Sequence, residues 1–593
     1  MSSAEVFTGT SLVLVSWIVS VLMVVALGSL LGCTGALSRN DAFRRSLWWG
    51  LAILITVVLL LSLGFSLGSP SVPLALLALA ASGGVIGFVS WRRLPRVSER
   101  PTPSMWWSSA ALGAALVFLA LAALGPVTNY DSGLYHLGAI RYQTEFGLVP
   151  GISNLYFPLG YSNSLTSLGA LLGSSPWELN GYRLVNGALL TLLALETLTR
   201  IRTREWSPGT MLLLGSLVFV WVPLVALSDY WVTSPTSDSA VLILTTVSVS
   251  YLADGLWKSI DKQSGTPDLF IALTTSLVLV SMRPTMVIFG VVLGFTVFAV
   301  LLRRTRRPVS GSTPGSSVGV VLGASVVTLG GLVALAQVLR DRILSGWLQY
   351  PLSIYSFDVP WQSDDPVWFR TATLGAARDP EDLWNAAETW GWIPGWIERS
   401  LSQWETAMVL VLIIASAVLA TLARARKCAP RVPLLLTAMM PSAVAVVAWF
   451  LVSPPYFRFI WGPLFTLCAL PGAWAASRIM ASASPSRKDL PRFMNMPGGI
   501  ALSLGAVVAF TAAFRWDSAS MTQRSTFVIG PVAIPYVVTP VVEAEIVDVT
   551  LTSGLDVVSP VTSDQCWDRY PLCTPLVNQS VTMAGTRISD GFR

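Results

Sequence analysis

The segment Asn129-Tyr130-Asp131-Ser132-Gly133-Leu134-Tyr135-His136 sets the character of this chain. It follows an apolar run from Met105 to Gly125 and contains the only histidine of the 593 residues. At this point continuous apolar side chains give way to acidic, aromatic and basic ones, as far as Arg141. Because roughly 20 apolar residues are enough to cross a bilayer, the change predicts that residues 129–141 emerge at a membrane surface.

The rest of the chain has the composition of a membrane protein. Hydrophobic residues make up 53% of it and charged residues only 12%, about half the charged fraction of a soluble domain. The net charge of +6 therefore gives no reason to predict a nucleic-acid partner, and the fold class is predicted to be an all-α polytopic membrane protein. Hydropathy predicts about fourteen spans, which begin near residues 10, 47, 72, 105, 180, 209, 237, 268, 285, 316, 406, 433, 458 and 497.

Basic residues predict the orientation of these spans. Every cluster of arginine and lysine follows an odd-numbered span, so the positive-inside rule predicts that these loops face the cytoplasm and that both termini lie outside. The pattern requires residues 268–302 to form two short spans that separate at Arg283-Pro284. One long helix there would reverse the orientation of every later loop.

Four charged residues fall at the outer ends of spans, where the positive-inside rule does not account for them: Asp131, Asp238, Arg283 and Arg458. A charge at the edge of the lipid is costly unless it is hydrated, paired or bound to a metal. The two guanidinium groups suit a pair of phosphate oxygens. Simpler explanations remain open, since either acid can cap a helix and either arginine can extend to the outer headgroups.

The residues after Asp131 predict a short amphipathic helix at the membrane interface. Leu134, Leu137 and Ile140 keep helical spacing. The residues on other faces are Tyr135, His136, Arg141 and Tyr142. The aromatic residues alternatively serve only as interfacial anchors.

The loop from about 339 to 405 is too long to be a simple connector. It contains the segment Ser345–Pro351, with Trp347 and Tyr350, followed by many tryptophans. Indole rings anchor proteins at the headgroup level and also stack on sugar faces, so both interpretations stay open.

The tail from about residue 515 alternates apolar and polar residues and predicts a small β-containing domain. Its Cys566 and Cys573 are predicted to form a disulfide, because two close cysteines outside the membrane are usually oxidised. The sequence has no zinc-type cysteine and histidine cluster and no P-loop or dinucleotide motif. The predicted parts are an N-terminal transmembrane scaffold (1–104), a transmembrane core (105–514) with outer loops 126–179, 229–237 and 339–405, and an extracytoplasmic C-terminal domain (515–593).

From about residue 105 onward the chain resembles the GT-C superfamily of polytopic glycosyltransferases. The segment Tyr130–His136 is similar to a YD(S/T)GLYH signature in a bacterial branch of multi-span proteins, and Ser234–Asp238 to its SP-x-x-D loop. Ser345–Pro351 is a looser match to an SG-x-P-L-Y-P segment. Arg458-Phe459 matches an RF pair, and Gln565–Pro575 matches a QCW…CTP tail.

The resemblance implies a GT-C-like core in a bacterial inner membrane, with the active site on the extracytoplasmic face. The donor would be a sugar on a polyprenyl phosphate, and the acceptor a glycan, lipid or protein. Asp131 would be the general base of an inverting transfer. The other expected site residues are Asp238 and His136 at the reaction centre, Arg283, Arg458 and Arg141 at the donor phosphate, and Tyr135, Tyr350 and Trp347 at the sugar or acceptor. A divalent metal (Mg or Mn) on Asp131 and Asp238 is left open.

Two other classes of protein compete with this interpretation. A transporter or flippase of lipid-linked saccharides also needs charges facing a cavity and a broken helix, but the unusual charges here gather at one membrane face. A polysaccharide polymerase or ligase would use the arginines without a required acid. A purely structural membrane protein explains the coincidence of outer-face features least well.

Overall fold

The computed structural model describes residues 3–96, 103–174, 176–203, 205–219, 232–260, 265–306, 317–364, 366–426, 431–482 and 520–593. Within these ranges the protein is mostly helical, and ten helices are long and apolar enough to cross a membrane. They are α1 (Ser3–Cys33), α2 (Arg39–Ser62), α3 (Ser71–Arg92), α8 (Val185–Arg202), α10 (Ser237–Ile260), α12 (Val287–Arg306), α13 (Ser317–Ser345), α17 (Trp404–Ala425), α18 (Val432–Val452) and α19 (Trp461–Ser482).

Four further apolar helices fall outside this set of ten: α4 (Pro103–Ala122), α7 (Ser164–Gly173), α9 (Pro208–Phe219) and α11 (Thr266–Met282). Every predicted span except the last, near residue 497, coincides with one of the helices α1–α4, α8–α13 and α17–α19. The last span lies outside the described residues, as do Asp229 and the start of the C-terminal domain before Ser520. The chain is therefore a many-helix membrane protein, while the count of fourteen stays a prediction.

The predicted break at Arg283 is present. Helix α11 ends at Met282, Arg283 is extended with φ −140° and ψ 90°, and a 3₁₀ turn (η5, Pro284–Met286) leads into α12. Proline disfavours the helical conformation for the residue before it and has no N–H to continue the helix. A second break follows α18, where Arg458 lies in a 3₁₀ turn (η6, Phe457–Phe459) before α19.

Basic residues from separate predicted cytoplasmic loops meet at one end of the bundle. Arg44 lies 3.0 Å from Glu205, and Lys258 lies 3.7 Å from Glu205 and 2.8 Å from Asp268. Asp238 is at the other end of α10, roughly 30 Å from Lys258 at 1.5 Å per residue. The structure thus confirms that these loops share one end and that Asp238 lies at the opposite one.

Helices of the predicted N-terminal scaffold contact those of the predicted core. Helix α2 packs against α7, α8, α11 and α13, and Trp48 of α2 donates a hydrogen bond to Glu196 of α8 over 3.2 Å. Trp48 and Trp49 are both buried. A helix that is apolar all round is expected to be enclosed by other helices, and residues 39–62 are enclosed in this way.

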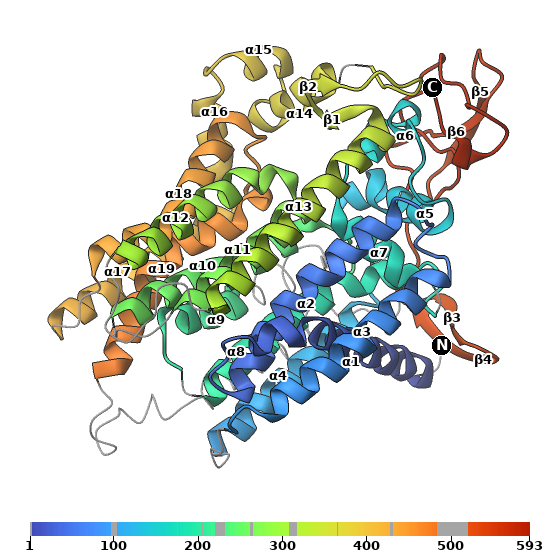
Figure 1. Cartoon of the computed structure of the whole chain (residues 1–593). Coiled ribbons are helices and arrows are strands. Elements are labelled where there is room, and N and C mark those ends of the chain that lie inside the picture. The colour runs from blue at the N-terminus through green and yellow to red at the C-terminus, as the bar shows by residue number, and fades with distance from the viewer. Residues whose placement is uncertain are drawn as a thin grey trace.

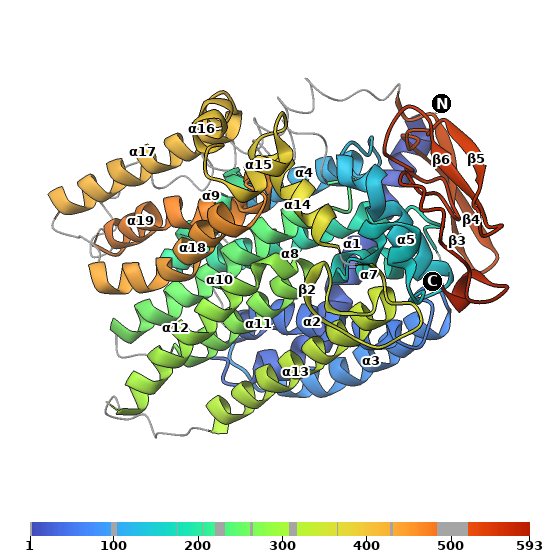
Figure 2. The same ribbon diagram turned by 90° about the horizontal axis from the view of Figure 1, so that it is seen from above.

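The connections at the Asp238 end form a layer over the bundle, and both termini lie near this layer (Figures 1 and 2). Its helices are α5 (Leu137–Glu145), α6 (Ile152–Leu155), α14 (Val367–Arg378), α15 (Leu383–Glu388) and α16 (Ile393–Leu401). Its strands form three antiparallel pairs: β1 (Trp347–Gln349) with β2 (Leu352–Ser356), β3 (Gln523–Ile529) with β4 (Val532–Val538), and β5 (Ile546–Thr550) with β6 (Asp556–Pro560). The last two pairs belong to the predicted C-terminal domain, which also contains the predicted Cys566–Cys573 disulfide.

Helix α5 differs from the amphipathic interfacial helix that its sequence predicts. Leu137 and Ile140 pack into the core of the bundle, as the spacing indicates, but Ala139 and Tyr142 are buried as well, in a cluster shared with the C-terminal domain. The helix is therefore enclosed between two parts of the protein rather than lying on lipid.

Candidate functional site

Asp131 stands at the start of an unusual turn. Residues Ser132–His136 form one turn of π-helix (η1) that leads into α5, and such turns occur frequently at functional sites. The Asp131 side chain makes no capping hydrogen bond to this turn. Instead, its Oδ2 lies 3.2 Å from Nη2 of Arg458. Helix capping therefore does not explain this acid.

Asp238 lies in the first turn of α10, where Thr236 provides the cap. The Thr236 hydroxyl accepts a hydrogen bond from the Asp238 N–H over 3.3 Å and donates one to Asp238 Oδ2 over 3.0 Å. The other carboxylate oxygen, Oδ1, is 3.2 Å from Nη1 of Arg283, which also donates to the Ser237 hydroxyl over 2.9 Å. Asp238 is thus the ion-pair partner of Arg283.

The two ion pairs belong to one cluster, because Phe459 contacts both arginines. Its ring centroid is 4.2 Å from the guanidinium carbon of Arg283 and 4.9 Å from that of Arg458, within the range of cation–π attraction. Burial opposes the charge on Arg458, but Asp131 and then Asp238 outweigh it and raise the pKa of this guanidinium. We call Asp131, Asp238, Arg283 and Arg458 the charged cluster.

The two acids of the charged cluster differ in access. The Asp131 side chain keeps 16% of its surface exposed and that of Arg458 keeps 23%, whereas the Asp238 side chain is fully enclosed. Asp131 and Arg458 are therefore partly exposed to solvent, while Asp238 is placed to orient Arg283.

Hydrogen bonds between distant loops bring the two acids together. The Ser234 hydroxyl accepts from the Asn129 N–H over 3.3 Å, and the Thr233 hydroxyl donates to the Pro126 carbonyl over 2.6 Å. The Asn186 amide of α8 donates to the carbonyls of Ser234 and Thr236, over 2.8 and 3.1 Å. The loop before Asp238 is thereby fixed against the segment before Asp131.

His136 lies behind the charged cluster as a neutral side chain. Its Nδ1 is 3.4 Å from the Ser132 hydroxyl and its ring is almost fully buried. Burial lowers the pKa of His136 to about 4; Arg283 and Arg458 act in the same direction, and Asp131 offsets part of the effect. At neutral pH the imidazole is therefore uncharged, and its ring is buried, whereas the Asp131 carboxylate is partly exposed.

This neutral histidine predicts a loss of stability in acid. The unfolded chain binds a proton at His136 below about pH 6.5, but the folded chain does so only near pH 4. The unfolded state then binds more protons in this window, and stability falls by roughly 3 kcal/mol as the pH drops through it. Unfolding of the full-length protein in detergent should show this slope between pH 6.5 and 4.5, and His136→Gln should remove it. An identical slope in the variant would contradict this assignment.

Aromatic residues extend from the charged cluster toward β1 and β2. The Tyr135 ring lies 4.4 Å from the His136 ring and 5.5 Å from that of Tyr161, which in turn lies 5.8 Å from Tyr350. Burial and the nearby Asp131 raise the pKa of Tyr135, so its hydroxyl stays protonated. Tyr135 and Tyr350, two of the three predicted sugar-contacting residues, are therefore joined through Tyr161 by successive ring contacts.

Two predicted site residues lie apart from the charged cluster. The Arg141 guanidinium is 3.9 Å from Asp568 and 5.7 Å from the centre of the Tyr570 ring, both in the C-terminal domain. The indole of Trp347 is buried and donates to the Ser363 carbonyl over 3.1 Å. Arg141 and Trp347 thus have partners outside the charged cluster, and their roles at the donor phosphate and at the sugar stay predictions.

The structure adds Phe459, Tyr161 and Thr236 to the residues expected from sequence. Phe459 is adjacent to Arg458 and Thr236 lies within the Ser234–Asp238 loop, so their proximity to candidate residues was a usable signal. Tyr161 is one of many aromatic residues in residues 126–179, and only the fold distinguishes it.

The carboxylates of the charged cluster fit a divalent cation poorly as they stand. Mg²⁺ and similar ions prefer anionic oxygen ligands, yet Asp131 and Asp238 each face a guanidinium group. Across the part of the chain that the structure describes, no group of three or more histidine, cysteine, aspartate or glutamate residues is arranged to hold a metal. No chemical step is assigned to a metal here.

One family model matches this chain, that of a domain of unknown function (DUF8201), and it covers residues 11–465. The match spans more than half of the chain and includes most of α1, all of α2 and α3, and the charged cluster. No curated protein and no solved structure matches the sequence.

Proposed function

The chain belongs to the DUF8201 family, and we propose that it is a membrane glycosyltransferase that takes a sugar from a polyprenyl-phosphate donor. The observation that supports this proposal best is the charged cluster. It combines an accessible carboxylate with two arginines that share one aromatic ring, at one end of a helical bundle. A general base beside a paired cationic site is what transfer from a phosphate leaving group needs.

The donor phosphate would bind between Arg283 and Arg458. Planar guanidinium groups form paired hydrogen bonds with phosphate oxygens, and both side chains are already held against Phe459. In the arrangement without donor, Arg458 is bonded to Asp131. A bound phosphate competes with Asp131 for Arg458, so donor binding would free this carboxylate at the moment when a base is required.

The proposed reaction is a single displacement with inversion. The acceptor hydroxyl oxygen forms a bond to the anomeric carbon of the sugar while Asp131 takes the hydroxyl proton. The bond between the anomeric carbon and the phosphate oxygen breaks, and its electron pair leaves with the polyprenyl phosphate. Arg283 and Arg458 stabilise the negative charge that develops on this phosphate, and Asp238 keeps Arg283 in place.

The proposed location is the extracytoplasmic face of a bacterial plasma membrane, with membrane lipids around the bundle. The charged cluster and the Arg44–Glu205–Lys258 network lie at opposite ends of the helices. Positive-inside bias assigns the network, with its basic loops, to the cytoplasm. The acceptor, whether a glycan, a lipid or a protein, would approach the exposed side of Asp131.

A transfer assay with the purified full-length chain in vesicles tests this proposal. Short-chain polyprenyl phosphates carrying different single sugars serve as donors, and alkyl glycosides serve as acceptors. We expect release of polyprenyl phosphate and a new glycosidic bond of the opposite anomeric configuration. Movement of donor across the vesicle with its sugar–phosphate bond intact, and no transfer, would instead identify a flippase.

A further inference from the structure

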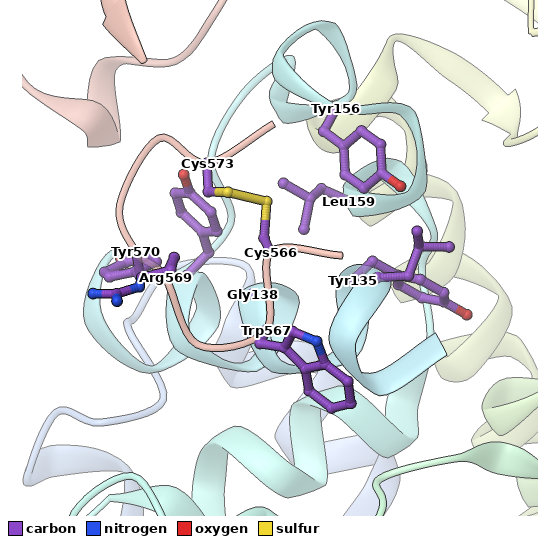
Figure 3. Close-up of a pocket in the computed structure, with 11 residues that line it drawn as sticks. Tyr135, Gly138, Tyr156, Leu159, Cys566, Trp567, Arg569, Tyr570 and Cys573 are labelled. Carbon is purple, nitrogen blue, oxygen red and sulfur yellow. A yellow bond between two sulfur atoms is a disulfide. The ribbon is translucent and has the colours of Figure 1, made fainter. Parts of the chain in front are cut away.

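The disulfide loop, residues Cys566–Cys573, lies directly against the segment that carries Asp131. Two sequence motifs more than 400 residues apart, the Tyr130–His136 signature and the Gln565–Pro575 tail, therefore form one structural unit. Figure 3 shows the disulfide beside Tyr156 and Leu159, with Trp567 close to the helix that carries Tyr135.

Gln565, just before the disulfide loop, holds the peptide bond that precedes Asp131. Its side-chain amide donates to the Tyr130 carbonyl over 2.8 Å. On the other side of the same peptide, the Asp131 N–H donates to the Asn129 side chain over 3.0 Å. The Tyr130 hydroxyl also bonds to Asp564. Both the C=O and the N–H of the Tyr130–Asp131 peptide are thus hydrogen-bonded. These two bonds fix the direction in which the Asp131 side chain leaves the backbone.

Trp567 fixes the π-helical turn that follows. Its backbone N–H donates to the Gly133 carbonyl over 2.8 Å, and its indole covers Gly133. A β-carbon at position 133 would lie 2.7 Å from two indole atoms and 2.9 Å from the Gln565 amide nitrogen. The glycine of the signature is therefore the position that lets the disulfide loop approach the backbone beside Asp131.

The rest of the loop is anchored on both sides. The Leu572 N–H donates to the Tyr142 hydroxyl of α5 over 3.1 Å, and the Tyr570 ring lies 4.9 Å from the Tyr142 ring. Thr574 and Leu572 bond to the backbone of Val558 in β6. Because the disulfide joins the ends of this short loop, it restrains the backbone that presents Trp567, next to Cys566.

We propose that Gln565 and Trp567 are positioning residues for Asp131, and that the Cys566–Cys573 disulfide is required to present them. The inference rests on the proposed function for its catalytic consequence, but its structural part stands on the contacts above. The C-terminal domain, which lies beyond the residues matched by the family model, thereby completes the reaction centre.

The test compares Gln565→Ala with Gln579→Ala, a change at an exposed glutamine of the same domain. For Gln565→Ala we expect a kcat about 100-fold lower, as for a misplaced catalytic group, with an unchanged KM for the lipid donor. If Gln565 acted only in folding, Gln565→Ala would lower the melting temperature and the amount of active protein. The kcat of the protein that does fold would then stay at the wild-type value. Gln579→Ala should keep both constants.

Hydrogen exchange on the full-length protein without substrate gives a second readout. Amides of residues 131–137 should exchange at least about tenfold faster in Gln565→Ala and in the double variant Cys566→Ser/Cys573→Ser. Cys468→Ser, at a free cysteine in α19, should leave that exchange unchanged. Unchanged exchange in both test variants would overturn the inference, and so would faster exchange with a wild-type kcat. Failure of the proposed function would look different, because the wild-type protein would then consume no donor.

Discussion

Asp131→Asn is expected to lower kcat for sugar transfer by about 1000-fold, while the affinity for the lipid donor changes by less than about tenfold. Asparagine has nearly the shape of aspartate but cannot accept the proton of the acceptor hydroxyl. The phosphate-binding arginines remain, and Arg458 loses the carboxylate that competes with phosphate for it. Measuring donor binding and single-turnover transfer separately distinguishes the two effects.

Asp548→Asn is the matched control for this variant. Asp548 is an exposed acid on β5 of the C-terminal domain, so the change removes the same charge outside the charged cluster. We expect wild-type transfer from it. If Asp131→Asn also transferred sugar at close to the wild-type rate, Asp131 would not be the base.

Arg458→Gln is expected to lower kcat by roughly 100- to 1000-fold and to weaken donor binding as well. Arg458 is the more exposed arginine of the charged cluster and contacts both Asp131 and Phe459. Its loss removes charge stabilisation from the leaving phosphate. Arg458→Lys should recover part of the binding but little of kcat, because an ammonium group lacks the planar fork that engages two oxygens.

The control is Arg370→Gln, at an exposed arginine of α14 in the same outer layer. Transfer rates should stay near wild type in this variant, because we expect Arg458 to act by binding the phosphate directly and not by adding to the positive charge of the surface. Equal losses in Arg370→Gln and Arg458→Gln would point to long-range attraction of the anionic donor instead of a specific phosphate site.

Local patterns were sufficient to predict most of the helices. Apolar runs locate them, and Arg283-Pro284 locates the break between α11 and α12, because proline acts on its immediate neighbour. The alternation of basic loops predicted that Arg44 and Lys258 share an end, and the structure brings them to one network. These features depend on nearby residues or on a simple count along the chain.

The composition of the site was predicted less completely. The sequence predicted phosphate-binding roles for Arg141 and Arg283 alike, because both arginines lie at outer positions. Only the packing of the chain shows that Arg283 faces Asp238 and that Arg141 faces Asp568. Phe459 joins the two ion pairs through space, and no sequence pattern encodes that contact. The role of Gly133 likewise becomes clear only with Trp567 in place.

Helix α5 shows why an amphipathic pattern is an incomplete guide. Its apolar spacing correctly indicated one buried face, formed by Leu137 and Ile140. The opposite face carries Tyr142, which a pattern assigns equally well to a headgroup interface or to a protein contact. A separate domain far along the chain supplies that contact through Leu572, and pairing of such distant segments is not visible in local periodicity.

The most direct test is a cryo-electron microscopy structure of Asp131→Asn with a polyprenyl-phosphate sugar bound. The phosphate is expected within hydrogen-bond distance of Arg283 and Arg458, with the anomeric carbon turned toward the side chain at position 131 and an open path for an acceptor. A donor phosphate bound away from both arginines, or a sugar facing away from position 131, would contradict this expectation.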